Sequence, residues 1–66
     1  MMFNKPPSPP PYDPLETAKE YRKNADYWER VGRMASDEGD VISARESFMV
    51  AQIWRQKARE IEVKFQ

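Results

Sequence analysis

The distribution of proline constrains the fold of this chain more than any other feature. All six prolines lie within the first 14 of the 66 residues, and the remaining 52 residues contain none. Successive proline rings fix φ and remove backbone N–H donors, so they favour an extended polyproline II segment over a helix. The sequence therefore divides into a proline-rich N-terminal arm, residues 1–13, and a helical hairpin domain, residues 14–66.

Two helix start signals and one stop signal follow the arm. Asp13 can cap a helix whose first residue is Pro14, and Glu16 stands where its side chain can bond back to the cap. Gly39 can adopt the left-handed conformation that closes a helix, and Asp40 can cap the next one. The signals predict helices over about 14–38 and 41–64. Because the connection is short, we expect an all-α, antiparallel two-helix hairpin.

Apolar and small residues recur three and four residues apart in both predicted helices. This spacing is typical of a helical stripe and not of the alternation in a strand. We expect the two stripes to face each other. The first consists of Ala18, Tyr21, Ala25, Trp28, Gly32 and Ala35, and the second of Val41, Ala44, Phe48, Ala51, Trp54, Ala58, Ile61 and Phe65. Acid-before-base pairs one helical turn apart, Asp26 with Arg30 and Glu29 with Arg33, indicate a solvated face.

Across residues 25–58 the pattern resembles the tetratricopeptide repeat. The residues that carry the resemblance are Trp28, Val31, Gly32, Ala35, Gly39, Val41, Ala44, Phe48 and Ala51. The resemblance implies a close-packed hairpin in which small residues bring the helices together and Trp28 and Phe48 fill the wider gaps. Gln56 stands where the repeat usually has proline, and there is one unit where about three are normally needed. The resemblance therefore implies the hairpin packing alone, and nothing about a peptide-binding groove carries over from the family.

Apolar residues outside these stripes form a surplus that one helix pair cannot cover. We predict that they bind a second copy or a partner protein, because a hairpin with so many small residues in its seam is thin for an unaided fold. Individually exposed apolar residues are the alternative interpretation. The predicted partner-binding residues are Tyr27, Val31 and Met34 in the first helix and Ile42, Met49 and Ile53 in the second.

The arm contains Pro9, Pro10, Pro11 and Tyr12, which match the PPxY pattern of ligands for WW domains. Two other interpretations stay open. The arm can be a disordered tail, or it can fold back along the first helix and lay its prolines over Tyr21 and Trp28, as in pancreatic-polypeptide-like miniproteins.

A basic cluster of Arg55, Lys57 and Arg59 lies near the end of the second helix. Cations there interact favourably with the helix dipole, which is a sufficient structural reason for them. Contact with phosphate is the alternative. Eleven basic and eleven acidic side chains give a net charge of zero, so the chain as a whole does not attract nucleic acid.

Composition argues against catalysis and against cofactor or metal binding. The chain has no cysteine and no histidine, so it lacks thiolate chemistry, the commonest general base and the commonest metal ligand. It shows no secretory leader, and its longest apolar run, Phe48–Ala51, is far too short to span a bilayer. We expect a cytoplasmic protein that is not an enzyme.

Taken together, these features predict a small protein-interaction module, acting as a regulator, adaptor or inhibitor. We expect it to associate with itself, as a dimer or small helical bundle, and to bind another protein through apolar helix faces. One alternative is a nucleic-acid-binding regulator that uses the basic cluster. Another is a structural subunit of a larger assembly.

Overall fold

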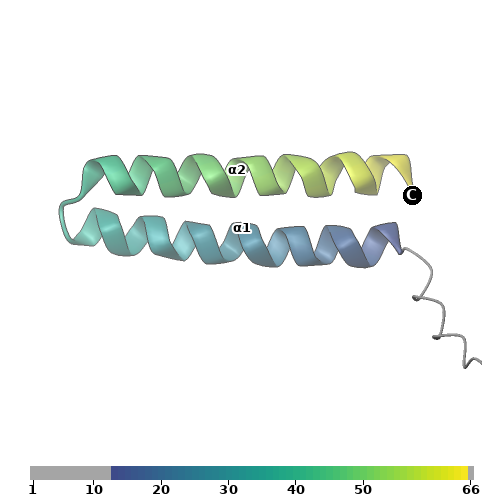
Figure 1. Cartoon of the computed structure of the whole chain (residues 1–66), viewed down its shortest axis with the longest axis horizontal. Coiled ribbons are helices and arrows are strands. Elements are labelled where there is room, and N and C mark those ends of the chain that lie inside the picture. Colours follow the sequence, from purple (N-terminus) through teal and green to yellow (C-terminus); the bar gives the residue numbers. More distant parts are fainter. Residues whose placement is uncertain (1–12, 66) are drawn as a thin grey trace, which may run out of the picture.

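The computed structural model describes residues 13–65, which form two helices, α1 (Pro14–Asp37) and α2 (Val41–Lys64). The helices lie side by side and run in opposite directions, joined by a tight turn (Figure 1). The predicted all-α hairpin is confirmed, and the first helix ends one residue before its predicted end.

Helix α1 begins with the predicted cap. The carboxylate of Asp13 accepts hydrogen bonds from the backbone N–H groups of Leu15, at 3.0 Å, and Glu16, at 3.3 Å. Pro14 takes the first helical position, where its missing N–H has no consequence. The Glu16 side chain does not return to the cap but lies 3.6 Å from Lys19.

The turn between the helices closes α1 with a Schellman arrangement. Gly39 has a φ of +81°, which a residue with a side chain rarely adopts. Its N–H donates to the carbonyl of Ser36 at 3.0 Å, and the N–H of Asp40 donates to the carbonyl of Ala35 at 2.8 Å. The carboxylate of Asp40 then accepts from the Ser43 N–H at 3.1 Å. Hydrogen bonding by Ser43 lowers the pKa of Asp40.

The core is a seam of small residues between the helices. Its members recur every seven residues in each helix, and all are buried: Ala18, Ala25 and Gly32 in α1, and Ala44, Ala51 and Ala58 in α2. Ser47 is buried beside them. Within residues 13–65, no large side chain is fully buried. Methyl groups and a glycine therefore bring the helices together, with no bulky side chain enclosed between them.

The bulky members of the predicted stripes do not fit inside this narrow seam, so part of the stripe prediction is wrong. Val41 and Phe65 are exposed, and Phe48 remains 37% exposed. The Phe48 ring lies over Gly32, where an added Cβ atom would stand 2.7 Å from it. Gly32 thus provides the space for this ring, while larger side chains elsewhere lie to one side of the seam.

Candidate interaction surface

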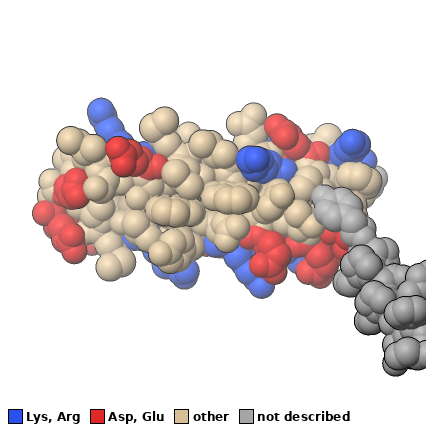
Figure 2. All heavy atoms as spheres, viewed as in Figure 1, with Lys and Arg blue, Asp and Glu red and all other residues tan. Residues whose placement is uncertain are grey.

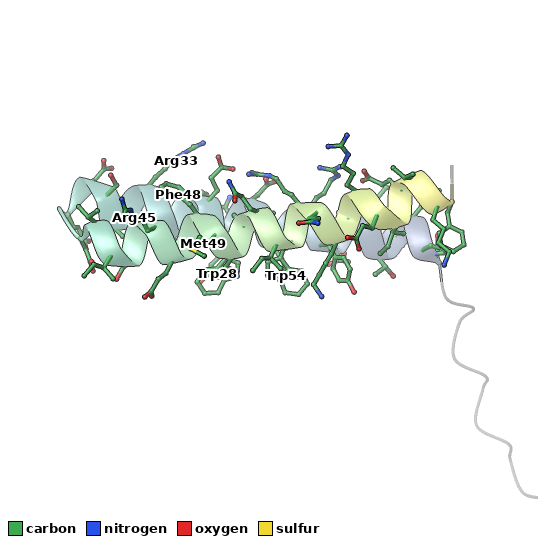
Figure 3. All side chains as sticks on the ribbon, turned by 90° about the horizontal axis from the view of Figure 1, so that it is seen from above. Trp28, Arg33, Arg45, Phe48, Met49 and Trp54 are labelled. Carbon is green, nitrogen blue, oxygen red and sulfur yellow. The ribbon has the colours of Figure 1, made fainter. Side chains whose placement is uncertain are left out.

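The two sides of the flat hairpin carry different side chains. Trp28 and Trp54 project to one side, whereas Arg33 and Phe48 project to the other (Figure 3). The distinction follows from helix geometry. Residues three positions after a buried seam residue lie on the tryptophan side, and residues four positions after it lie on the opposite side.

We call the first side the aromatic face, and all its members are half-buried. They are Tyr21, Trp28, Val31 and Ala35 from α1, with Val50, Trp54 and Ile61 from α2. The rings of Tyr21 and Trp54 pack across the helices with centroids 5.1 Å apart. Figure 2 looks onto this face and shows a band without Lys, Arg, Asp or Glu along the middle of the hairpin, with charged side chains toward its edges and ends. The aromatic face is thus an apolar surface that spans both helices, with the exposed polar residues Asn24 and Lys57 in the same rows as Val31 and Val50.

The opposite side, the charged face, joins the helices by ion pairs. Arg22 binds both carboxylate oxygens of Glu62, with its Nε 2.6 Å from one and its Nη2 2.5 Å from the other. Arg55 binds Glu29 and also lies 3.7 Å from Asp26. Within the part of the chain that the structure describes, every ion pair between the helices lies on this face.

Two of these pairs favour the ionised form of their glutamates. The hydrogen bond from Arg55 is the main cause of a lowered pKa for Glu29, and that from Arg22 lowers the pKa of Glu62. Glu29 also accepts from Arg33 at 3.2 Å, as its one-turn spacing predicted. Asp26 has Arg55 as its partner, where the sequence predicted Arg30.

The predicted partner-binding residues are accessible but do not form one surface. Five of the six are more than half exposed. By helical position, Met34 lies on the edge of α1 that points away from α2. Ile42 and Met49 lie on the opposite edge of the hairpin, pointing away from α1. The sequence showed that these residues lie outside the seam. It did not show that Met34 of α1 points in the direction opposite to Ile42 and Met49 of α2.

The other three lie on the aromatic face or at its two opposite borders. Val31 belongs to the aromatic face, and Tyr27 and Ile53 border it. The Tyr27 ring packs edge-on against Trp28, with centroids 5.4 Å apart. That these residues bind a partner stays a prediction.

The predicted basic cluster is divided between the two faces. Arg55 and Arg59 line a hollow on the charged face together with Arg22. Lys57 lies on the aromatic side, seven residues after Val50, because residues two apart on a helix do not share a side. Arg55 and Arg22 are both engaged by carboxylates of the neighbouring helix.

Three further features concern the proline motif, metal binding and membrane spans. The PPxY residues Pro9–Tyr12 lie outside the described residues. Among residues 13–65, no cluster of three acidic side chains could hold a metal ion. Neither described helix combines the length and apolarity needed to cross a membrane.

Comparison with known protein families, with curated proteins and with solved structures gives no match.

The ion pairs between the helices were not among the predictions, although the sequence contains a signal for them. Arg22, Glu29, Arg55 and Glu62 each stand four residues after a buried alanine. Positions of this kind flank a close helix–helix seam, and oppositely charged side chains there can meet across it.

Proposed function

We propose that this chain is a small, non-enzymatic protein-interaction module, acting as a regulator, adaptor or inhibitor, and that it docks a helical protein surface on its aromatic face. The observation that carries this proposal is the division of apolar residues. The buried seam contains only small side chains, while the large rings and branched side chains of the aromatic face stay half-buried.

A binding role explains this division better than an isolated hairpin does. Burial of apolar area contributes about 25 cal/mol per Å², and a single core in a chain below about 70 residues rarely supplies more than a few kcal/mol. Covering the aromatic face would bury the remaining area of two tryptophans and their neighbours. A contiguous exposed apolar surface of this kind marks an interaction site.

The charged face is less suited to recognition. Arg22 and Arg55 are engaged by carboxylates of the same hairpin, and binding phosphate through them would require breaking those pairs. No separate observation favours nucleic-acid binding, so we treat it only as the alternative that the experiment below must distinguish.

The test compares one substitution on each face. Val50→Asp places a charge in the aromatic face, and Gln52→Asp places the same charge at an exposed position nearby. We expect Val50→Asp to abolish association with the chain's own copies and with protein captured from its native source. Gln52→Asp should leave both unchanged. Circular dichroism of each variant checks that the helices persist.

Salt dependence and Arg59→Glu test the nucleic-acid alternative. Apolar docking changes little with added salt, whereas binding to phosphates weakens steeply. The proposed function is wrong if Arg59→Glu abolishes binding while Val50→Asp leaves it intact.

A further inference from the structure

We propose that the occupant of the aromatic face is a second copy of this chain. In the proposed dimer, α1 of each copy packs antiparallel on α2 of the other, around a two-fold axis that runs along the hairpin. The inference rests on the proposed function and deepens it by naming the partner. The observation that carries it is that complementary residues of α1 and α2 lie at the same height along the length of the hairpin, which we call their level.

The levels follow from contacts within the hairpin. Gly32 contacts Phe48, and Asp26 lies near Arg55. In antiparallel helices with the same rise, residues whose numbers total about 80 therefore share a level. A two-fold axis along the hairpin keeps each residue at its own level and places α1 over the partner's α2. On the aromatic face, each α1 residue therefore lies beside the residue of the partner's α2 that has the same level.

Apolar residues of the aromatic face and of its borders then meet in register. Val31 shares its level with Val50 to within about one residue, and Tyr27 shares its level with Ile53. Within one hairpin, Tyr27 and Ile53 point toward opposite edges. Across the proposed interface they come to the same side, where each flanks the contact between helices. The arrangement covers residues that the single hairpin leaves more than half exposed.

The charged residues at the border of the face are complementary in the same arrangement. On α1 the border carries Glu20, seven residues before Tyr27. On α2, Lys57 and Lys64 continue the row of Val50 at intervals of seven residues. Glu20 shares its level with a point between these two lysines, about one helical turn from each. Its contact with Lys23 of its own helix, at 3.5 Å, is exposed and competes weakly.

The other two-fold arrangement of the same faces lacks this match. An axis across the middle of the hairpin places α1 on the partner's α1 and α2 on the partner's α2. Glu20 then comes level with Val31 of the partner subunit, and Lys57 with Val50 of the partner subunit. Charges meet apolar side chains in that arrangement, which disfavours it.

The size of the face suits a stable dimer. Each helix has 24 residues, so the face is about 36 Å long and about 20 Å wide. Two such faces bury roughly 1,400 Å² in total, within the range of specific protein–protein interfaces.

Engineered disulfides in the full chain test the arrangement, because the natural chain has no cysteine. With Val31→Cys and Val50→Cys together, we expect oxidation to give a covalent species of twice the 7.8 kDa chain mass. Asn24→Cys alone should give no covalent dimer under the same conditions, because Asn24 lies opposite α2 of the partner subunit. A disulfide-linked Asn24→Cys dimer would overturn the proposed arrangement, since it requires α1 to lie on α1.

Charge exchange gives a second readout that needs no cysteine. Glu20→Lys and Lys57→Glu should each weaken dimerisation about two- to fivefold, as measured by sedimentation equilibrium, and the double variant should recover it. Additive losses in the double variant would contradict the proposed pairing.

Failure of the dimer and failure of the proposed function give different results. If the wild-type protein sediments as a monomer at every micromolar concentration, the proposed dimer is wrong. If Val50→Asp then still abolishes capture of another protein and Gln52→Asp does not, the proposed function stands with a different occupant.

Discussion

The aromatic and charged faces of one hairpin differ in how their side chains are satisfied. On the charged face, Arg22 and Arg55 find their partners on the neighbouring helix. On the aromatic face, the packing of Tyr21 on Trp54 leaves both rings half-buried. Side chains four residues after a seam residue find ionic partners within the chain. The rings three residues after a seam residue keep part of their apolar area exposed.

The two faces also contribute to different properties. Exposed ion pairs stabilise a fold by at most about 1 kcal/mol each, so the charged face mainly fixes how the helices are aligned. Half-buried aromatic rings hold apolar area whose further burial stabilises any complex. The proposed function thus places association on the side opposite to the ion pairs that align the helices, and the following substitutions test this proposal.

The largest effect is expected at the seam, where both faces originate. Ala51→Leu forces a larger side chain between two helices held in close contact, and we expect it to lower the free energy of unfolding by about 1–3 kcal/mol. Urea unfolding followed by circular dichroism measures the loss. The control is Gln52→Leu, at the exposed neighbouring position, which should change stability by no more than about 0.5 kcal/mol. Equal losses from the two variants would contradict the close-packed seam.

A smaller effect should distinguish the faces directly. Trp54→Ala and Phe48→Ala each remove one large ring, the first from the aromatic face and the second from the charged face. We expect Trp54→Ala to cost about 2 kcal/mol and to remove the concentration dependence of unfolding. Phe48→Ala should reduce stability less and keep that concentration dependence. Unfolding at low and high protein concentration checks both, and a loss of concentration dependence with Phe48→Ala alone would reverse the assignment of the faces.

The smallest effect concerns pH and belongs to the charged face. Arg22 lowers the pKa of Glu62, so this pair contributes stability above the ordinary glutamate pKa of about 4.3. That contribution is lost as the pH falls through the lowered folded value. We expect Glu62→Gln to reduce stability at neutral pH and to flatten its decline in acid.

Thermal unfolding between neutral pH and about pH 3 measures this decline. The control, Glu60→Gln, changes an exposed glutamate on the same helix. A decline that stays the same after Glu62→Gln would show that the ion pair does not contribute to acid sensitivity.

The helix boundaries could be predicted because their causes are local. Asp13 and Pro14 fix the start of α1, and Gly39 and Asp40 fix the turn, through bonds that reach only a few residues. The candidate site was less predictable. A stripe shows which residues point toward the neighbouring helix, but not how closely the helices approach.

That distance decides where Trp28 and Trp54 lie. The seam is so narrow that both rings lie on the same side of it, and they define a face that the stripes alone did not indicate. The levels of Arg22 and Glu62, forty residues apart in the chain, likewise depend on the length of the turn. Both facts follow from the combination of two helices and cannot be obtained from either one.

The contact of Phe48 with Gly32 also limits mispairing between chains. If the turn opened and helices from two chains paired, a slip of seven residues would still set alanine beside alanine along most of the seam. It would, however, bring the Phe48 ring to Ala25, whose methyl group occupies the space that is empty at Gly32. One glycine in the repeating row thus disfavours a slip of seven residues toward the start of α1 and limits the exchange of helices in that wrong alignment.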